Sequence, residues 1–454
     1  MAGIGFQLQK LIEDESFLKK AKAYIFASII TSGPWILSII CLGFIGLLSG
    51  RFTTAKKFSS ISITIVYTFA FSLIFTGPLQ FTLTRYLADK EYMKQKEKML
   101  SALLTALIIS LAVSLSLSVP WYYYNGEGSL EYKAAGISLF VIICAIWTMM
   151  DFLSCSKNYS GIIASFFIGS FMSLLLSPLL GGFYDTDGAL WGYTIGQSFI
   201  LISLLYYIIR EFPYNGIFNR EFMKYFRLFP FIFFTGLFYN LGLWSDKLLG
   251  WFFLGEKIFG NFMAYTLYDT PVFIAYLIII PSLAYFLIQS ETRFFLAHRN
   301  FFDSISREPL DTILKYKEEL FRLLKSSILR LFCIQGVSSL IGYIFSGLIG
   351  EWFGLSLQSQ TMLRILFFAA GGQVMFLYII IFLMYFDLSR MSFILVLLFF
   401  LLNTGLNLLF IYFPILPMGT GYLLSVLSVF FLGLGLLIYS VSDIEYTIFM
   451  RQEN

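Results

Sequence analysis

Two adjacent ionisable residues inside a long apolar run are the strongest candidates for function. Asp246 and Lys247 interrupt the segment from Leu228 to Phe253, and Asp269 stands at the start of the next apolar run. A charge inside a bilayer costs roughly 2.5–3.5 kcal/mol on insertion scales, so such residues mark functional sites. Neighbouring helical residues point about 100° apart, so we expect Asp246 and Lys247 not to pair with each other.

A partner for Lys247 is therefore expected on another helix. If both apolar runs are helices that cross a membrane, Lys247 and Asp269 lie at similar depths near the outer surface. We hypothesise that Lys247 and Asp269 form an ion pair at an outer gate, and that Asp246 faces a central cavity. A purely structural pair between helices is the alternative.

The usual groups of enzymes and metal sites are scarce. The only histidine, His298, lies in a charged segment, and the four cysteines (Cys41, Cys144, Cys155 and Cys333) lie in or beside apolar runs without metal-ligand spacing. The phosphate-binding pattern GxxxxGK[ST] is absent from the sequence. We predict no catalytic residues, no metal and no cofactor, so energy must come from an ion gradient, from polymer synthesis or from a partner.

Composition places these residues in an all-α integral membrane protein. Of the 454 residues, 58% are hydrophobic and 13% are charged, about half of the ~25% charged residues of soluble domains. Charge-free windows predict about twelve transmembrane helices, because backbone groups in lipid must be satisfied within each segment. The longest window, Met391 to Ser442, is divided into two by Pro414, Pro417 and Gly419. The net charge of +4 does not indicate a nucleic-acid partner.

The distribution of Lys and Arg predicts the orientation. With the amino terminus inside, the predicted inner segments hold 24 of these residues and the outer segments hold 6. This bias predicts a multi-pass protein of the cytoplasmic membrane with both termini in the cytoplasm. The spans divide six and six, into an amino-terminal lobe (1–209, with an amphipathic first segment), a cytoplasmic linker (210–227) and a carboxy-terminal lobe (228–454).

A cytoplasmic amphipathic segment is expected within 291–327. In its core, Pro309 to Lys325, apolar residues lie on one face of the expected helix, and Lys315, Arg322 and Lys325 lie on the opposite face. Pro309 fits the first position of this helix. Two interpretations stay open: a helix lying on lipid headgroups, or a surface that docks a cytoplasmic partner through these three cations.

Several short segments resemble the PelG family, the membrane transporter of the Pel exopolysaccharide system. They are 1–6 (MAGIGF), 32–38 (SGPWILS), 239–247 (YNLGLWSDK), 268–271 (YDTP), 280–284 (IPSLA) and 290–293 (SETR). The resemblance implies the multidrug/oligosaccharidyl-lipid/polysaccharide flippase superfamily, a MATE-like fold in which two six-helix lobes form a V around a central cavity. It also implies a cytoplasmic glycosyltransferase that makes an N-acetylgalactosamine-rich polymer, and small membrane partners that include a cyclic-di-GMP sensor.

Polar, aromatic and helix-breaking residues gather on the first, second, seventh and eighth predicted spans, which line the central cavity in that superfamily. Aromatic rings there would stack on sugar faces or, alternatively, form an interfacial belt. The predicted transport pathway comprises Trp35, Gln80, Tyr239, Asn240, Trp244, Asp246, Lys247, Tyr268 and Asp269, and the predicted hinges or kinks are Gly33, Pro34, Gly77, Pro78 and Pro281.

The sequence therefore predicts a transporter that guides a nascent amino-sugar polymer outward, with the polysaccharide, the bilayer, the glycosyltransferase and small membrane proteins as partners. An ion-coupled exporter of small amphipathic molecules, with Asp246 or Asp269 titrating, is the main alternative. A membrane polymerase is a further class, which the short outer loops disfavour. A structural platform for the synthase is the last.

Overall fold

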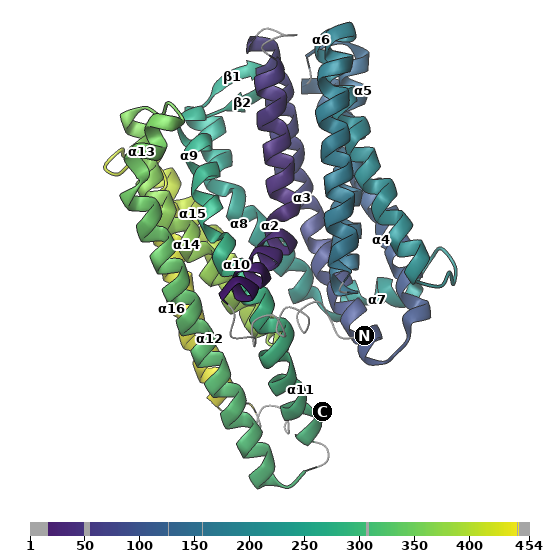
Figure 1. Cartoon of the computed structure of the whole chain (residues 1–454), viewed down its shortest axis with the longest axis vertical. Coiled ribbons are helices and arrows are strands. Elements are labelled where there is room, and N and C mark those ends of the chain that lie inside the picture. Colours follow the sequence, from purple (N-terminus) through teal and green to yellow (C-terminus); the bar gives the residue numbers. More distant parts are fainter. Residues whose placement is uncertain are drawn as a thin grey trace. The chain divides into compact units, whose positions relative to one another are not determined.

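The chain is almost entirely helical (Figure 1). The computed structural model describes residues 17–49, 55–125, 127–156, 158–305, 308–442 and 444. Most of the predicted amphipathic amino-terminal segment lies outside these residues. The elements of the first part of the chain are α2 (Phe17–Ser49), α3 (Ala55–Tyr92), η1 (Lys96–Lys98), α4 (Met99–Asn125), α5 (Leu130–Cys155), α6 (Tyr159–Glu211), α7 (Arg220–Leu228), α8 (Pro230–Leu249), the π-helix η2 (Gly250–Leu254), β1 (Glu256–Phe259) and β2 (Phe262–Ala264).

The remaining elements are again helical. They are α9 (Thr266–Tyr276), η3 (Leu277–Ile279), α10 (Ile280–Gln289), the π-helix η4 (Ser290–Phe294), α11 (Phe295–Ile305), α12 (Leu310–Ile344), α13 (Ser346–Trp352), α14 (Leu357–Tyr385), α15 (Ser389–Tyr412) and α16 (Thr420–Ser442).

The described residues support the predicted number of membrane spans. Nine helices are long and apolar enough to cross a membrane. Two bent pairs, Lys22–Gly33 with Ile36–Ile45 and Arg220–Leu228 with Pro230–Leu254, raise the number to eleven when each pair is counted as one span. The 53-residue α6 supplies one more, because Tyr184 and Asp185 have non-helical backbone angles and divide it into two arms. The arms fold back on each other so closely that a Cβ on Gly192 would lie 2.4 Å from the Leu176 carbonyl oxygen. Twelve spans result, as predicted.

The chain packs as two compact units, and their limits differ from the two halves of the sequence. One unit comprises residues 33–266, and the other comprises residues 1–32 with 267–454. α8, which was expected to begin the second lobe, packs against α3 inside the first unit. The predicted lobes 1–209 and 228–454 stay a prediction, because compact packing does not show which helices move together.

The segment 309–325 is not a separate surface helix, which corrects the sequence-based expectation. It forms the first half of α12, a 35-residue helix that continues into the ninth span. At 1.5 Å per residue α12 is about 50 Å long, whereas the hydrocarbon core of a bilayer is about 30 Å thick. Pro309 precedes the helix as its N-cap residue and is not its first helical residue.

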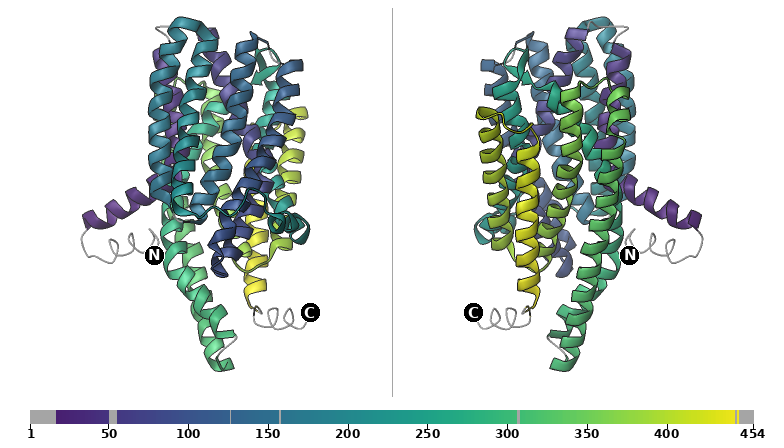
Figure 2. Two further views of the ribbon diagram at one scale, coloured as in Figure 1. Left: turned by 90° about the vertical axis from the view of Figure 1, so that its right-hand side faces the viewer. Right: turned by 90° about the vertical axis from the view of Figure 1, so that its left-hand side faces the viewer.

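The projecting part of α12 pairs with α11. Ile313, Leu320 and Leu324 of α12 are buried, and α11 packs against α12. In Figure 2 this helical pair (green) extends beyond the end of α16 (yellow), which belongs to the same unit. The predicted apolar face is therefore covered in part by protein, at Ile313 and Leu324, whereas Leu310 and Leu314 are exposed. Lys315, Arg322 and Lys325 are exposed on the other side.

The only strands among the described residues form a short hairpin between α8 and α9. β1 and β2 pair antiparallel, with Lys257 opposite Met263. Gly260, at the turn, has a φ of +55°, a left-handed conformation that glycine adopts without steric cost. The hairpin packs against α3 in the first unit.

Candidate functional site

The central feature of the first unit is a close crossing of α3 and α8. A Cβ added to Gly77 would lie 2.3 Å from the Asn240 amide nitrogen and 2.6 Å from the Gly236 carbonyl oxygen. A Cβ on Gly236 would lie 2.3 Å from the Gly77 carbonyl oxygen. Small residues allow helix backbones in a membrane to approach this closely. Two predicted residues, Gly77 and Asn240, thus meet at one crossing, and α3 continues through Pro78 as a single helix.

Asn240 contributes a buried amide to this crossing. It is 6% exposed, and its Nδ2 donates to the Gly236 carbonyl oxygen at 3.0 Å. Such a bond within the helix spares the amide a desolvation cost of several kcal/mol, roughly 4–8 kcal/mol in an alkane-like medium. The same amide also packs directly against Gly77, where a larger residue would clash with it.

Asp246 and Lys247 lie nearer the other end of α8 and form an ion pair, so the expectation that they do not pair is wrong. The Lys247 Nζ lies 3.1 Å from the Asp246 Oδ1 and donates to the Leu243 carbonyl oxygen at 2.8 Å. The two side chains are 0% and 7% exposed. The helical angle between the residues does not prevent pairing, because the four-carbon lysine stem folds back to its neighbour.

The surroundings of Lys247 favour its charge. Its Nζ is 5.8 Å from the centre of the Trp244 ring, whose face attracts cations. The indole Nε1 of Trp244 is buried and has no hydrogen-bond partner in the described part of the chain. The predicted cavity-facing role of Asp246 and the predicted Lys247–Asp269 pair remain predictions, since Asp269 belongs to the other unit.

The remaining predicted pathway and hinge residues are distributed over both units. Tyr239 and Gln80 are half-buried, and the Tyr239 ring is 6.5 Å from that of Phe81. In the other unit Tyr268 is fully buried and Asp269 is half-buried. Gly33 is the first residue of the first unit, whereas the side chains of Pro34 and Trp35 are outside the described part. Pro281 follows the 3₁₀ segment η3 at the start of α10.

The hairpin secures α3 to the far end of α8. The Tyr67 hydroxyl on α3 donates to the Met263 carbonyl oxygen at 2.9 Å and accepts from the Met263 amide at 3.0 Å. The Tyr67 ring stacks on Trp251 of η2 at 4.6 Å and meets Phe262 of β2 edge-on at 4.9 Å. One tyrosine thus joins α3 to both the end of the seventh span and the hairpin that follows it.

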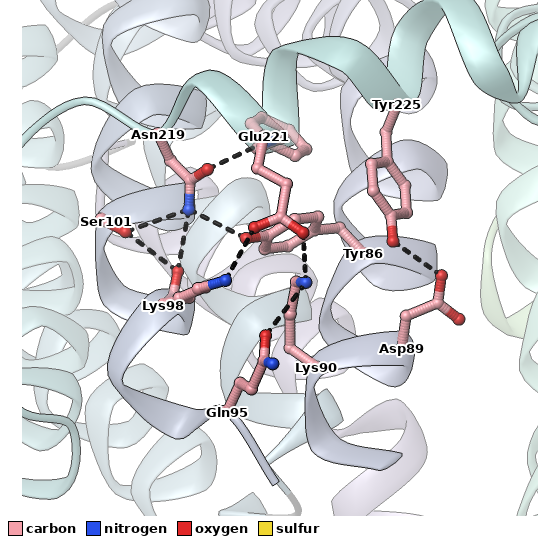
Figure 3. Close-up of polar contacts among 10 residues, drawn as sticks. Tyr86, Asp89, Lys90, Gln95, Lys98, Ser101, Asn219, Glu221 and Tyr225 are labelled. Atoms are coloured by element: carbon pink, nitrogen blue, oxygen red, sulfur yellow. Dashed lines mark hydrogen bonds and ion pairs between the residues drawn. The ribbon is translucent and has the colours of Figure 1, made fainter. Parts of the chain in front are cut away.

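At the opposite end of α3, the helix α7 is held by a polar cluster (Figure 3). The Glu221 carboxylate on α7 accepts from Lys90 of α3 and from Lys98 at 3.1 Å. Lys90 also donates to Gln95 at 3.2 Å, and its side chain is only 3% exposed. The Tyr225 hydroxyl donates to Asp89 at 2.9 Å. α7 is therefore bound to α3 by charge-assisted bonds, which are roughly twice as strong as neutral ones.

Asn219 begins α7 and completes this cluster. Its Oδ1 accepts from the Phe222 amide at 3.0 Å, as an N-cap does. Its Nδ2 donates to the Tyr86 hydroxyl at 2.9 Å and lies 3.1 Å from the Ser101 hydroxyl. The same residue starts the helix and ties it to α3 and α4.

Sequence reasoning missed this cluster. Lys90 and Lys98 contributed only to the count of inner positive charges, and Asn219 and Glu221 lay in a segment read as a linker. The available signal was Asn219 followed by Glu221, since an N-cap asparagine with an acidic residue in the first turn is typical of a helix start. α7 then meets α8 at a bend of 77°.

The charge on Glu221 predicts how this cluster responds to pH. The hydrogen bonds and charges of Lys90 and Lys98 lower the pKa of Glu221 below its ordinary value of 4.5. A lowered pKa stabilises the fold above the ordinary value, and this contribution is lost as pH falls through the folded-state value. We expect the Glu221→Gln variant to melt below wild type at pH 7, by a modest amount because the carboxylate is 41% exposed, and to depend less on pH between 7 and 4.

The measurement is the thermal unfolding of the purified chain in detergent by intrinsic fluorescence. Glu97→Gln is the matched control, because Glu97 is exposed on η1. Equal melting temperatures and equal pH profiles for the two variants would show that Glu221 does not stabilise α7.

Comparison with known proteins identifies the family. The family model PelG, described as "Putative exopolysaccharide Exporter (EPS-E)", matches residues 1–449. No curated protein matches the chain.

Solved structures share the fold at low identity. A MOP superfamily transporter from Pyrococcus furiosus Vc1 (DSM3638) is 15% identical, with a TM-score of 0.65 over 96% of this chain and 98% of that one. A MATE structure in the bent conformation is 14% identical, with a TM-score of 0.65 over 98% and 99%. A MATE structure in complex with MaL6 is 14% identical, with a TM-score of 0.64 over 92% and 97%. These likenesses show the fold, which in MATE transporters has twelve helices in two lobes. Fold and family together show that the chain belongs to the PelG family and is a multi-pass membrane transporter with the fold of the MATE/MOP superfamily.

Proposed function

We propose that this protein translocates a Pel-type amino-sugar exopolysaccharide across the cytoplasmic membrane as a cytoplasmic glycosyltransferase synthesises it. The observation that carries the proposal is the match to the exporter family over residues 1–449. The chain's own features agree with a polar but uncharged cargo. The charges of α8 neutralise each other in the Asp246–Lys247 pair, and aromatic residues such as Tyr239 and Trp244 lie near them on the same helix.

The test is export in a strain that lacks the gene for this chain. Wild type on a plasmid is expected to restore surface polymer that an N-acetylgalactosamine-binding lectin detects, and without it the polymer should stay in the cell or fail to form. The same cells report the alternative function. Normal polymer export together with protonophore-sensitive dye efflux that depends on this chain would replace our proposal with an ion-coupled exporter.

The projecting pair of α11 and α12 is the surface that we propose for the glycosyltransferase. It presents the exposed cations Lys315, Arg322 and Lys325 on the first half of α12. Reversal of Arg322 and Lys325 to glutamate is expected to lower recovery of the co-purified enzyme about tenfold, the effect of losing about 1.4 kcal/mol, at unchanged membrane levels.

Reversal of Lys224 and Arg227, two exposed cations of α7, is the matched control. The same loss in both double variants would mean that net charge, and not this surface, recruits the enzyme. No loss in either would remove the docking assignment.

The orientation is also a proposal. It places α7 and the α11–α12 pair in the cytoplasm, because the segments on that side of the predicted topology hold 24 Lys and Arg residues and those on the other side hold 6. In a chain without its native cysteines, Tyr124→Cys, on an exposed position at the end of α4, should react with an impermeant maleimide in intact cells. Glu318→Cys, exposed on α12, should react only after lysis, and its reaction in intact cells would invert the orientation.

A further inference from the structure

A small aromatic cavity lies between α3, α4 and the hairpin in the first unit. Its volume is about 150 Å³. Seven of its ten lining residues are aromatic, and they come from α3, α4, α5 and β2. Tyr67, Phe71 and Phe75 form an i, i+4 stripe on α3, and Trp121 and Phe262 face them from α4 and β2.

The hydroxyl groups of the wall are already used within the protein. Tyr67 is bonded to both backbone groups of Met263, and Ser118 donates to the Ser114 carbonyl oxygen at 2.7 Å. A sugar placed here would bury several hydroxyls without partners, which is unfavourable. Dry apolar cavities of this size instead bind small apolar guests such as benzene or xenon. The chemistry of the wall selects a hydrocarbon.

The position of the cavity indicates which apolar molecule can enter it. The lining residue Leu117 is 37% exposed, and Val113, one turn earlier on the same face of α4, is 39% exposed. α4 is one of the helices long and apolar enough to cross a membrane, so exposed apolar side chains on it contact acyl chains of the bilayer. Phe71, Phe75 and Trp121 are half-buried, so the cavity opens beside this surface.

We propose that this cavity is a lipid site, in which one acyl chain of a bilayer phospholipid inserts between α3 and α4 beneath the hairpin. Phe262, which the hairpin contributes, is the wall that the chain end contacts. Because Tyr67 holds the same hairpin to α3, the bound acyl chain packs against the contact that joins the seventh span to α3. This inference is independent of the polymer that the protein transports.

The test uses the full chain in nanodiscs whose phospholipid carries a diazirine on one acyl chain. After illumination, peptides of α3 and β2 that contain Phe71, Phe75 or Phe262 should be labelled. Ser118→Leu fills the cavity from α4 and is expected to lower this labelling about tenfold, equivalent to about 1.4 kcal/mol. Ser116→Leu is the matched control, because Ser116 lies on the same helix but is exposed, and it should leave the labelling unchanged.

A second variant, with the opposite expected effect, keeps the proposal testable if Ser118→Leu does not fold. Phe75→Ala enlarges the cavity and should raise the labelling, and native mass spectrometry should show a retained phospholipid in wild type that Ser118→Leu lacks. Equal labelling in the wild type, Ser118→Leu and Phe75→Ala proteins would overturn the proposal. Retention of a small aromatic solute with no bound phospholipid would overturn it as well.

Discussion

Replacing Gly236 with alanine is expected to destabilise the fold markedly by forcing α3 and α8 apart. The new Cβ would lie 2.3 Å from the Gly77 carbonyl oxygen, 2.7 Å from its carbon and 3.0 Å from the Pro78 nitrogen. All three atoms are backbone, so the clash is relieved only when α3 and α8 separate. Overpacking typically costs about 1–3 kcal/mol, and a clash with backbone belongs at the upper end.

The measurements are thermal unfolding in detergent and polymer export at matched membrane level. Gly435→Ala on α16 is the control, since a Cβ there meets nothing within 4 Å and alanine favours the helix by about 1 kcal/mol over glycine. We expect Gly435→Ala to be neutral or slightly stabilising. If the two variants unfold at the same temperature, the close crossing of α3 and α8 does not exist in the membrane.

Removing the charge of Lys247 is expected to destabilise the fold even more than Gly236→Ala does. Lys247→Met leaves the fully buried Asp246 carboxylate without its ammonium partner, and breaking a buried pair costs about 3–5 kcal/mol. The double variant Asp246→Asn, Lys247→Met should recover much of that stability, because it removes both buried charges.

A double-mutant cycle then separates the two candidate partners of Lys247. Coupling with Asp246, at 3.1 Å, should exceed about 1 kcal/mol in unfolding. Coupling of Lys247 with Asp269 should appear in export, with the double alanine variant less damaged than the sum of the single ones, if those residues form the hypothesised outer gate. Strictly additive export losses of the Lys247 and Asp269 variants, at matched membrane level, would remove the gate. Additive effects of the Asp246 and Lys247 variants on unfolding would show that the buried pair is not an energetic unit.

Sequence by itself determined that the chain is helical and how many segments cross the membrane. Apolar windows located both arms of α6, because a segment in lipid must satisfy its own backbone and therefore becomes a helix. They also placed the end of the seventh span near Phe253, where η2 ends at Leu254. The motifs shared with the PelG family led to the family that the model comparison shows. These features depend on local composition and spacing, which a single sequence records.

Tertiary structure alone decided which surfaces meet. The apolar face of 309–325 was expected to rest on lipid or on a partner, but Ile313 and Leu324 of that face are buried within the protein, and α11 packs against α12. Asp246 and Lys247 were expected to seek distant partners, but a flexible lysine stem lets them pair with each other. Gly77 was predicted to be a hinge because it is a glycine beside a proline. In the structure its missing side chain lets the backbone of α8 pack closely against α3. Each outcome depends on side-chain reach and on contacts between residues far apart in the chain, and hydrophobic periodicity carries neither.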